Sequence, residues 1–169
     1  DASRDELQAH IHRMEKEARL VARGTIGEEL EQGSFLAPHI FEIPDISMLE
    51  DEAFGPVLHV IRYSASNLEG VLASIKATGF GLTFGVHSRI EQRWLDLFKG
   101  SNVGNTYVNR NMIGAVVGVQ PFGGEGLSGT GPKAGGPNYL ARFATERVLS
   151  INTAATGGNV DLFRLEEGD

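Results

Sequence analysis

An acidic cluster runs directly into an aromatic residue in the segment 50–56, which reads EDEAFGP. The carboxylate of Glu52 offers acceptor oxygens suited to two neighbouring ribose hydroxyls, and the ring of Phe54 offers a face for packing on a planar ring. Spacing alone does not separate this interpretation from a solvated acidic turn, which is the more frequent use of such a segment. Glu52 and Phe54 are therefore candidate nucleotide contacts.

A second candidate site lies in the glycine-rich stretch 114–136. Consecutive backbone N–H groups around a glycine, such as those of Gly114 and Ala115, form a concave seat for an anion. Phe122 is placed to wall such a pocket, and Arg110 and Lys133 add positive charge nearby. For each residue alone, a turn-forming role or a place in the core is the alternative.

The same stretch contains a literal G-x-G-x-x-G at positions 124–129. In a dinucleotide fingerprint this pattern opens a helix directly after a strand. Here Pro121 and two glycines intervene before it, and Pro132 follows it closely, so no helix can begin there. We interpret these glycines as an irregular loop.

Several kinds of catalysis are excluded by composition. The chain has no cysteine, which removes disulfides, thiolate metal ligands and every thiol nucleophile. Its five histidines show no spacing typical of a metal site. The sequence therefore predicts no thiol nucleophile and no metal centre.

Length and net charge limit the class of protein and the partners that it can have. A chain of 169 residues is the size of one domain, and its formal charge of −7 disfavours nucleic acid as a partner. No apolar run approaches the roughly 20 residues that span a bilayer, so we expect a soluble, cytoplasmic protein without a transmembrane segment. Because residue 1 is aspartate and not methionine, we expect a piece of a longer polypeptide.

Helical and extended patterns alternate along the chain. Ser-x-x-Glu signatures and apolar periodicity predict helices over about 3–21, 66–79 and 88–100, and Pro137 is expected to open a fourth that runs to about residue 148. Runs of β-branched and aromatic residues predict strands at 35–41, 57–63, 82–86, 106–109 and 148–152. This alternation is typical of an α/β fold with helices on both faces of a sheet.

Three ordered segments resemble signatures from the C-terminal part of aldehyde dehydrogenases: Glu52–Pro56, Gly104–Asn109 and Pro121–Gly124. The fuller stretch 114–136 and the segment 145–152 are most similar to the pyrroline-5-carboxylate dehydrogenase module of bacterial proline utilization A. The resemblance covers nearly the whole chain and is loosest at its C-terminal end.

This resemblance implies roles for the candidate residues. Glu52 would receive the nicotinamide ribose hydroxyls of NAD, and Phe54 would lie beside the nicotinamide. The amides of Gly114 and Ala115 would seat the α-carboxylate of L-glutamate γ-semialdehyde, and Phe122 would pack on the aliphatic chain of that substrate.

The resemblance also implies an architecture. Residues 1–147 would form part of a three-layer αβα open sheet, residues 148–152 an oligomerisation strand, and residues 153–169 a tail or linker. The expected partners are an N-terminal dinucleotide-binding domain of the same protein and further copies in a homo-oligomer. FAD is expected only if a proline dehydrogenase domain is fused upstream.

The sequence departs from the family pattern in one decisive respect. Family chemistry begins with attack of a cysteine thiolate on the aldehyde, and this chain has no cysteine. We therefore predict part of an NAD-dependent dehydrogenase that oxidises glutamate semialdehyde to glutamate in proline catabolism, inactive by itself. The alternative is a non-catalytic aldehyde-dehydrogenase-like assembly domain, against which the retention of Glu52, Phe54 and Gly114 argues.

Overall fold

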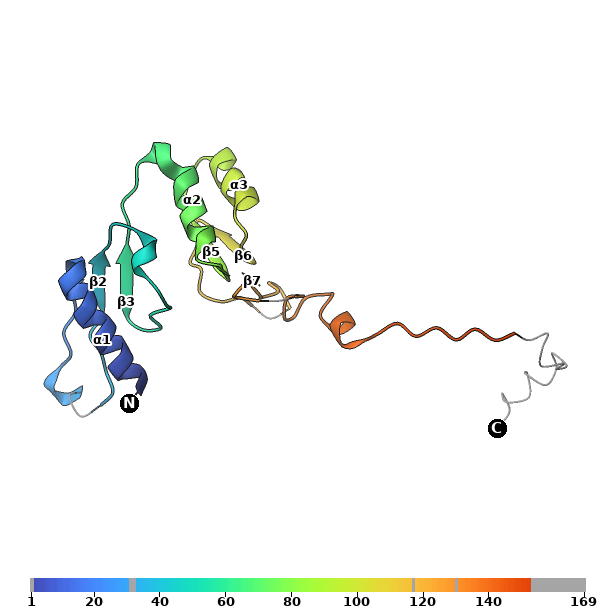
Figure 1. The fold of residues 1–169 in the computed structure, drawn as a ribbon, viewed down its shortest axis with the longest axis horizontal. Coiled ribbons are helices and arrows are strands. Elements are labelled where there is room, and N and C mark those ends of the chain that lie inside the picture. The colour runs from blue at the N-terminus through green and yellow to red at the C-terminus, as the bar shows by residue number, and fades with distance from the viewer. Residues whose placement is uncertain (1, 31–32, 117, 130, 153–169) are drawn as a thin grey trace.

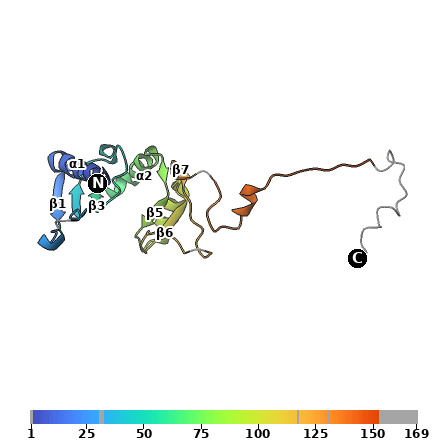
Figure 2. The ribbon, with the colours of Figure 1, turned by 90° about the horizontal axis from the view of Figure 1, so that it is seen from below.

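A computed structural model describes residues 2–30, 33–116, 118–129 and 131–152. Helix α1 (Ala2–Glu17) packs on a three-stranded sheet in the order β1 (Arg19–Arg23), β2 (His39–Glu42) and β3 (Val57–Val60) (Figures 1 and 2). Strand β1 pairs antiparallel with β2, whereas β2 and β3 are parallel. A short 3-10 helix, η1 (Glu28–Leu30), lies in the connection between β1 and β2.

The core of this first part is formed between α1 and the sheet. Ile11 and Met14 lie one turn apart on α1, and they cluster with Phe41 of β2 and with Ile43 directly after it. Met14 and Phe41 are completely buried. Leu49 and Val57 pack against the edge of this cluster and so attach the loop that connects β2 to β3.

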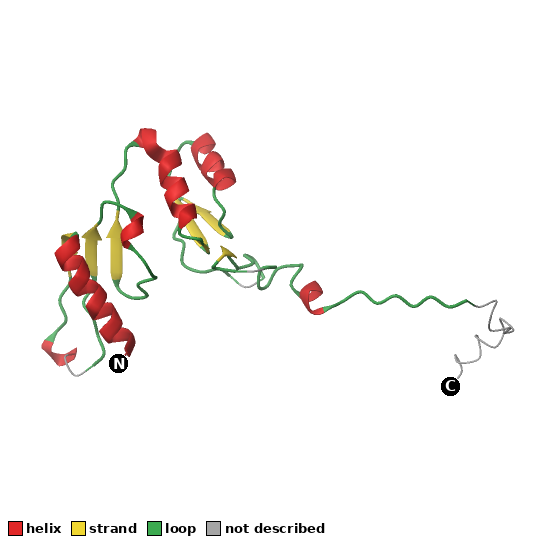
Figure 3. Cartoon of the chain, in the orientation of Figure 1, coloured by secondary structure: helices red, strands yellow, loops and turns green. Residues whose placement is uncertain are grey.

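A second group of elements follows the segment η3 (Ala65–Asn67). Helix α2 (Leu68–Ala77) leads to β4 (Phe80–Gly81) and β5 (Thr83–Val86), and helix α3 (Glu91–Gly100) connects β5 to β6 (Asn105–Val108) (Figure 3). Strands β5 and β6 are parallel, so β5, α3 and β6 form a β-α-β unit. Val86, Leu97 and Tyr107 are its buried residues.

The chain then leaves the sheets. Strand β7 (Glu125–Gly126) returns to pair antiparallel with β4, and a 3-10 helix, η4 (Leu140–Phe143), precedes an extended segment that runs away from both sheets (Figure 1). The parallel strand pairs and their helices confirm the predicted α/β fold. The single three-layer sheet stays a prediction, because the described strands form one sheet of three strands and two of two.

Two predicted helices differ from the structure. The first ends at Glu17, and Val21, which periodicity placed on its apolar face, lies instead at the irregular step in the pairing of β1 with β2. The fourth, expected from Pro137, is reduced to η4. Leu140 and Phe143 are exposed, and a short helix without a buried apolar face is marginal in water.

The C-terminal predictions stay open. Residues 148–152 form no strand with other parts of the described chain and are exposed, while the predicted tail 153–169 lies outside the described residues. Within the described ranges, no helix combines the length and the apolar character needed to cross a membrane.

Candidate functional site

The loop that carries Glu52 and Phe54 connects η2 (Ile46–Met48) to β3. Asp45 caps η2 by accepting a hydrogen bond from the backbone N–H of Ser47 at 2.8 Å, and this bond lowers the pKa of the Asp45 carboxyl. On the other side, Gly55 lies so close to Leu7 of α1 that an added Cβ would meet that side chain at 2.5 Å. The loop is therefore held between the sheet and α1.

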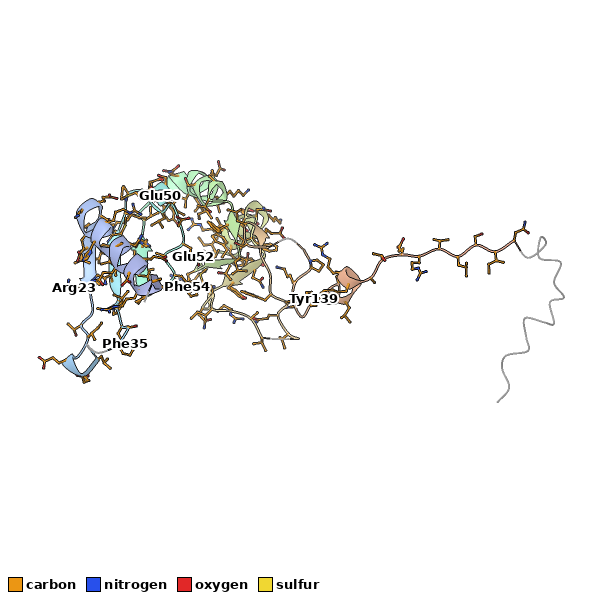
Figure 4. All side chains as sticks on the ribbon, turned by 60° about the horizontal axis from the view of Figure 1, so that its bottom comes forward. Arg23, Phe35, Glu50, Glu52, Phe54 and Tyr139 are labelled. Atoms are coloured by element: carbon orange, nitrogen blue, oxygen red, sulfur yellow. The ribbon has the colours of Figure 1, made fainter. Side chains whose placement is uncertain are left out.

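Glu52 and Phe54 both face solvent. The ring of Phe54 is 85% exposed, and the carboxylate of Glu52 makes no hydrogen bond or ion pair with the residues that the structure describes. Both line a groove of about 510 Å³ against the N-terminal turns of α1. Figure 4 shows them on the same loop as Glu50. An unpartnered carboxylate beside an accessible ring suits a ligand that carries hydroxyls and a planar ring.

Glu52 also borders a larger cavity. This cavity, of about 770 Å³, lies between the loop and the elements α2, β4 and β5, and its walls include Ile75, Phe80 and Leu82. The two hollows therefore meet at the acidic residues Glu50, Asp51 and Glu52, which line both of them. The apolar walls and the acidic rim give a ligand both packing area and acceptors.

Gly114 and Ala115 follow β6 in the long loop. Gly114 has φ +63°, a conformation that favours glycine, and its carbonyl accepts a hydrogen bond from the Tyr107 hydroxyl at 2.8 Å. Neither the Gly114 nor the Ala115 N–H donates a hydrogen bond to another described residue. Both amides are thus available to an anion, and their role as a carboxylate seat stays a prediction.

Phe122 lies near the other end of the same loop. Its backbone N–H and carbonyl pair with Ala134 at 3.1 and 2.9 Å, and its side chain is half-buried. This backbone bridge restricts the positions that the Phe122 ring can occupy. The structure does not join the two candidate sites, because neither cavity lined by Glu52 is lined by Gly114, Ala115 or Phe122.

Lys133 has a structural role that sequence reasoning missed. Its ammonium group donates to the carbonyls of Gly104 and Gly123 at 2.6 and 2.5 Å and to Asn105 Oδ1 at 3.2 Å. An ammonium group has three protons, so these bonds engage all of its donors. The lysine therefore joins backbone segments and is not free to bind an anion.

Arg110 keeps its charge near the proposed anion seat but is held by an aromatic ring. Its guanidinium lies over the Tyr107 ring, 5.0 Å from the ring centroid. The ring of a buried tyrosine thus restrains the charge that the sequence placed near the anion seat. No local pattern indicates this contact, because Tyr107 reads simply as a β-forming residue.

A pair of histidines lies behind the groove that Phe54 lines. His10 of α1 and His59 of β3 approach with their Nε2 atoms 2.9 Å apart, and the rings meet edge to face. Burial lowers the pKa of both imidazoles, and the nearby Arg13 lowers each further. At neutral pH one ring donates and the other accepts.

Parallel strand pairs joined by helices, with an acidic and aromatic loop entering β3, define an α/β domain with a candidate nucleotide groove. The family model described as "Aldehyde dehydrogenase family" matches residues 1–149. The chain belongs to the aldehyde dehydrogenase family.

Individual relatives show which members of the family this chain is similar to. The bifunctional protein PutA of Rhizobium meliloti is 50% identical over 143 residues, covering 85% of this chain and 12% of that protein. A Bradyrhizobium japonicum proline utilization A structure, mutant D779W, is 60% identical with a TM-score of 0.84, covering 91% and 15% of the two chains. The Thermus 1-pyrroline-5-carboxylate dehydrogenase with bound NAD is 38% identical with a TM-score of 0.73, covering 84% and 27%. The chain spans about an eighth of the first relative's length.

Proposed function

We propose that this chain forms the C-terminal part of the catalytic domain of an NAD-dependent L-glutamate γ-semialdehyde dehydrogenase, which oxidises the aldehyde to glutamate in proline catabolism. The observation that carries the proposal is a 60% identity to a proline utilization A structure over 91% of the chain. The 38% identity to a 1-pyrroline-5-carboxylate dehydrogenase with bound NAD supports the same substrate class.

In this proposal Glu52 and Phe54 hold the nicotinamide end of NAD. The fit rests on a carboxylate without a partner among the described residues and on a ring that is 85% exposed in the same groove. Bound NAD supplies a hydride acceptor. The protein's part would be to orient the ribose, with Glu52 accepting hydrogen bonds from its hydroxyls and Phe54 offering a face to the nicotinamide.

The substrate end is formed by the long loop. The amides of Gly114 and Ala115 receive the α-carboxylate, since they make no hydrogen bond within the described chain, and Phe122 packs on the methylene groups. Such an anchor would hold the α-carboxylate, which is at the opposite end of the substrate from the reacting aldehyde carbon.

The remaining machinery comes from outside this sequence. With no cysteine present, the nucleophile must be supplied by another part of the protein, together with the dinucleotide-binding domain that holds the adenosine half of NAD. FAD enters the proposal only if a proline dehydrogenase domain is fused upstream. The location in the cytoplasm is part of the same proposal.

The incomplete sheets support an assembly proposal as well. Two-stranded sheets are rarely stable alone, and we take the described strands to be sections of one three-layer αβα sheet. The exposed apolar segment 148–152 is proposed as a strand that pairs with a second copy in a homo-oligomer. The open groove at Glu52 argues against a purely non-catalytic assembly domain.

Substitution of Phe122 tests the proposed substrate site. In the full-length protein, Phe122→Ala should raise KM for glutamate semialdehyde roughly tenfold through lost packing, and leave KM for NAD within about twofold. The measurement is NADH formation at 340 nm with each substrate varied in turn. Phe143→Ala, an exposed aromatic on η4, is the matched control.

Two outcomes would contradict the proposal. Equal effects of Phe122→Ala on both substrates would remove that residue from the substrate pocket. A full-length protein that forms no NADH from glutamate semialdehyde would favour the assembly domain instead.

A further inference from the structure

Strand β6 presents two polar side chains on one face toward the long loop. Asn105 and Tyr107 are two residues apart, and alternate residues of a strand point to the same side. Tyr107 is only 6% exposed, and Asn105 is half-buried. Buried polar groups are costly unless they are hydrogen-bonded, so the partners of these two side chains carry information.

The Tyr107 hydroxyl reaches the beginning of the loop. It donates to the carbonyl of Gly114 at 2.8 Å, across seven positions of sequence. The same peptide unit that presents this carbonyl continues into the N–H of Ala115. Because a peptide unit is planar, holding the carbonyl fixes the direction in which that N–H points.

The Asn105 side chain reaches the end of the loop. Its Nδ2 group donates to the carbonyl of Pro121 at 3.0 Å, and its Oδ1 atom accepts from the N–H of Gly123 at 3.2 Å. These two bonds bracket Phe122 on both sides. Lys133 reinforces the clamp by donating to Asn105 Oδ1 and to the carbonyl of Gly123.

Three apolar side chains in the described part of the loop lie at the surface and do not anchor it. Val116 and Val119 are exposed, and so is Ile113 just before the anchor glycine. A loop with an exposed middle takes its position from its ends, and here both ends are tied to one strand. The separation between the proposed carboxylate seat and Phe122 is therefore restrained by β6, together with the bridge between Phe122 and Ala134.

We infer that Asn105 and Tyr107 are positioning residues for substrate specificity, which hold the carboxylate seat and the aromatic wall at a fixed separation. Neither side chain needs to touch the substrate. The inference rests on the proposed function of the same loop. It goes further in assigning to β6 the role of holding the two parts of that site at a fixed separation.

The test removes one hydroxyl. In the full-length protein, Tyr107→Phe should raise KM for glutamate semialdehyde and the inhibition constant for glutamate roughly tenfold each. Both ligands carry the α-carboxylate. KM for NAD, and kcat/KM for butanal, which has no α-carboxylate, should stay within about twofold of the wild type, because neither ligand uses the carboxylate seat that Tyr107 holds.

Tyr63→Phe is the matched control, since Tyr63 is exposed and makes no hydrogen bond to any residue that the structure describes. It should leave all four quantities unchanged. Asn105→Ser provides a second variant, which should impair glutamate semialdehyde and butanal alike while leaving KM for NAD within about twofold, because Asn105 holds the Phe122 end of the loop and both aldehydes have an aliphatic chain.

Other outcomes would contradict either the positioning role or the proposed function. If Tyr107→Phe changes glutamate semialdehyde and butanal equally, or changes neither, the positioning role is wrong while the proposed function stands. If the wild-type protein does not prefer glutamate semialdehyde to butanal, the proposed function fails, and the inference fails with it.

Discussion

Two glutamates of this chain show how the same side chain serves different purposes. Glu42 receives Arg19 from β1 and Arg62 from beyond β3, and these hydrogen bonds lower the pKa of its carboxyl. Both oxygens are thereby engaged in joining strands. Glu52 has no such partner among the described residues and lies where two hollows meet. At the residue scale, a carboxylate without a protein partner is a candidate ligand contact, whereas a carboxylate held by two arginines is part of a structural ion pair.

Glu52→Gln should therefore impair cofactor use. Replacing one carboxylate oxygen by an amide leaves a single good acceptor for two ribose hydroxyls, so we expect KM for NAD to rise roughly tenfold. Steady-state kinetics on the full-length protein measure the effect. Glu50→Gln, an exposed neighbour on the same loop, is the control and should change KM by less than about twofold.

An equal response to both substitutions would contradict this prediction. It would indicate that the loop contributes only general negative charge. The acidic cluster would then be the solvated turn that its spacing alone suggests.

At the scale of elements, α1 and β3 are linked by a contact that depends on neutral rings. His10 and His59 share one hydrogen bond, and protonating both would place two like charges beside Arg13. Phe41 stacks against His59 from β2 at 6.5 Å between ring centroids, so the pair also borders the core. The docking of α1 therefore relies on an uncharged form.

The sign of the pH dependence follows. Burial lowers the folded-state pKa of both histidines from 6.5, so the unfolded chain binds more protons as the pH falls. The stability from this pair is fully present above about pH 6.5 and is lost as the pH falls toward the folded-state pKa values.

Hydrogen–deuterium exchange of α1 peptides measures this loss. After correction for the intrinsic pH dependence of exchange, protection of α1 should decrease between about pH 7.5 and about pH 5. His10→Gln should flatten that decrease. His12→Gln alters an exposed ring on the other side of the same helix and should not. A pH-independent protection in the unsubstituted protein would show that the pair does not hold α1.

The elements also show where local patterns succeed. Helices α2 and α3 end near Gly79 and at Gly100, close to the predicted positions, and Gly79 has φ +76°, a conformation typical of a helix C-terminus. Strand β1 was missed. All five of its residues are exposed, so it lacks the alternation by which a half-buried strand is predicted.

At the scale of the whole molecule, the chain exposes apolar surface that its own elements do not cover. Leu58 of β3, Phe80 of β4 and Val148 and Leu149 of the C-terminal segment are all exposed. Surfaces of this kind mark contacts with other protein segments. They agree with the proposal that further strands and further copies complete the fold.

The 169-residue chain alone should therefore form no NADH from glutamate semialdehyde and NAD. It contains no cysteine to attack the aldehyde, and the proposed partner domain that holds the adenosine half is not part of it. Absorbance at 340 nm over a long incubation measures this, with the full-length protein as positive control. Turnover by the pure chain would overturn the assignment of the nucleophile to another segment.

Much of the candidate site was available from the sequence. The acidic and aromatic loop, the glycine-rich stretch and the absence of cysteine are properties of residue type and short spacing, which determine local chemistry. The tertiary structure decided which of these groups are free. It engages Lys133 with three acceptors, places Arg110 on Tyr107, and ties the long glycine-rich loop to β6 through Asn105 and Tyr107. Those contacts join residues up to 29 positions apart, and local periodicity cannot predict partners that are so distant in the sequence.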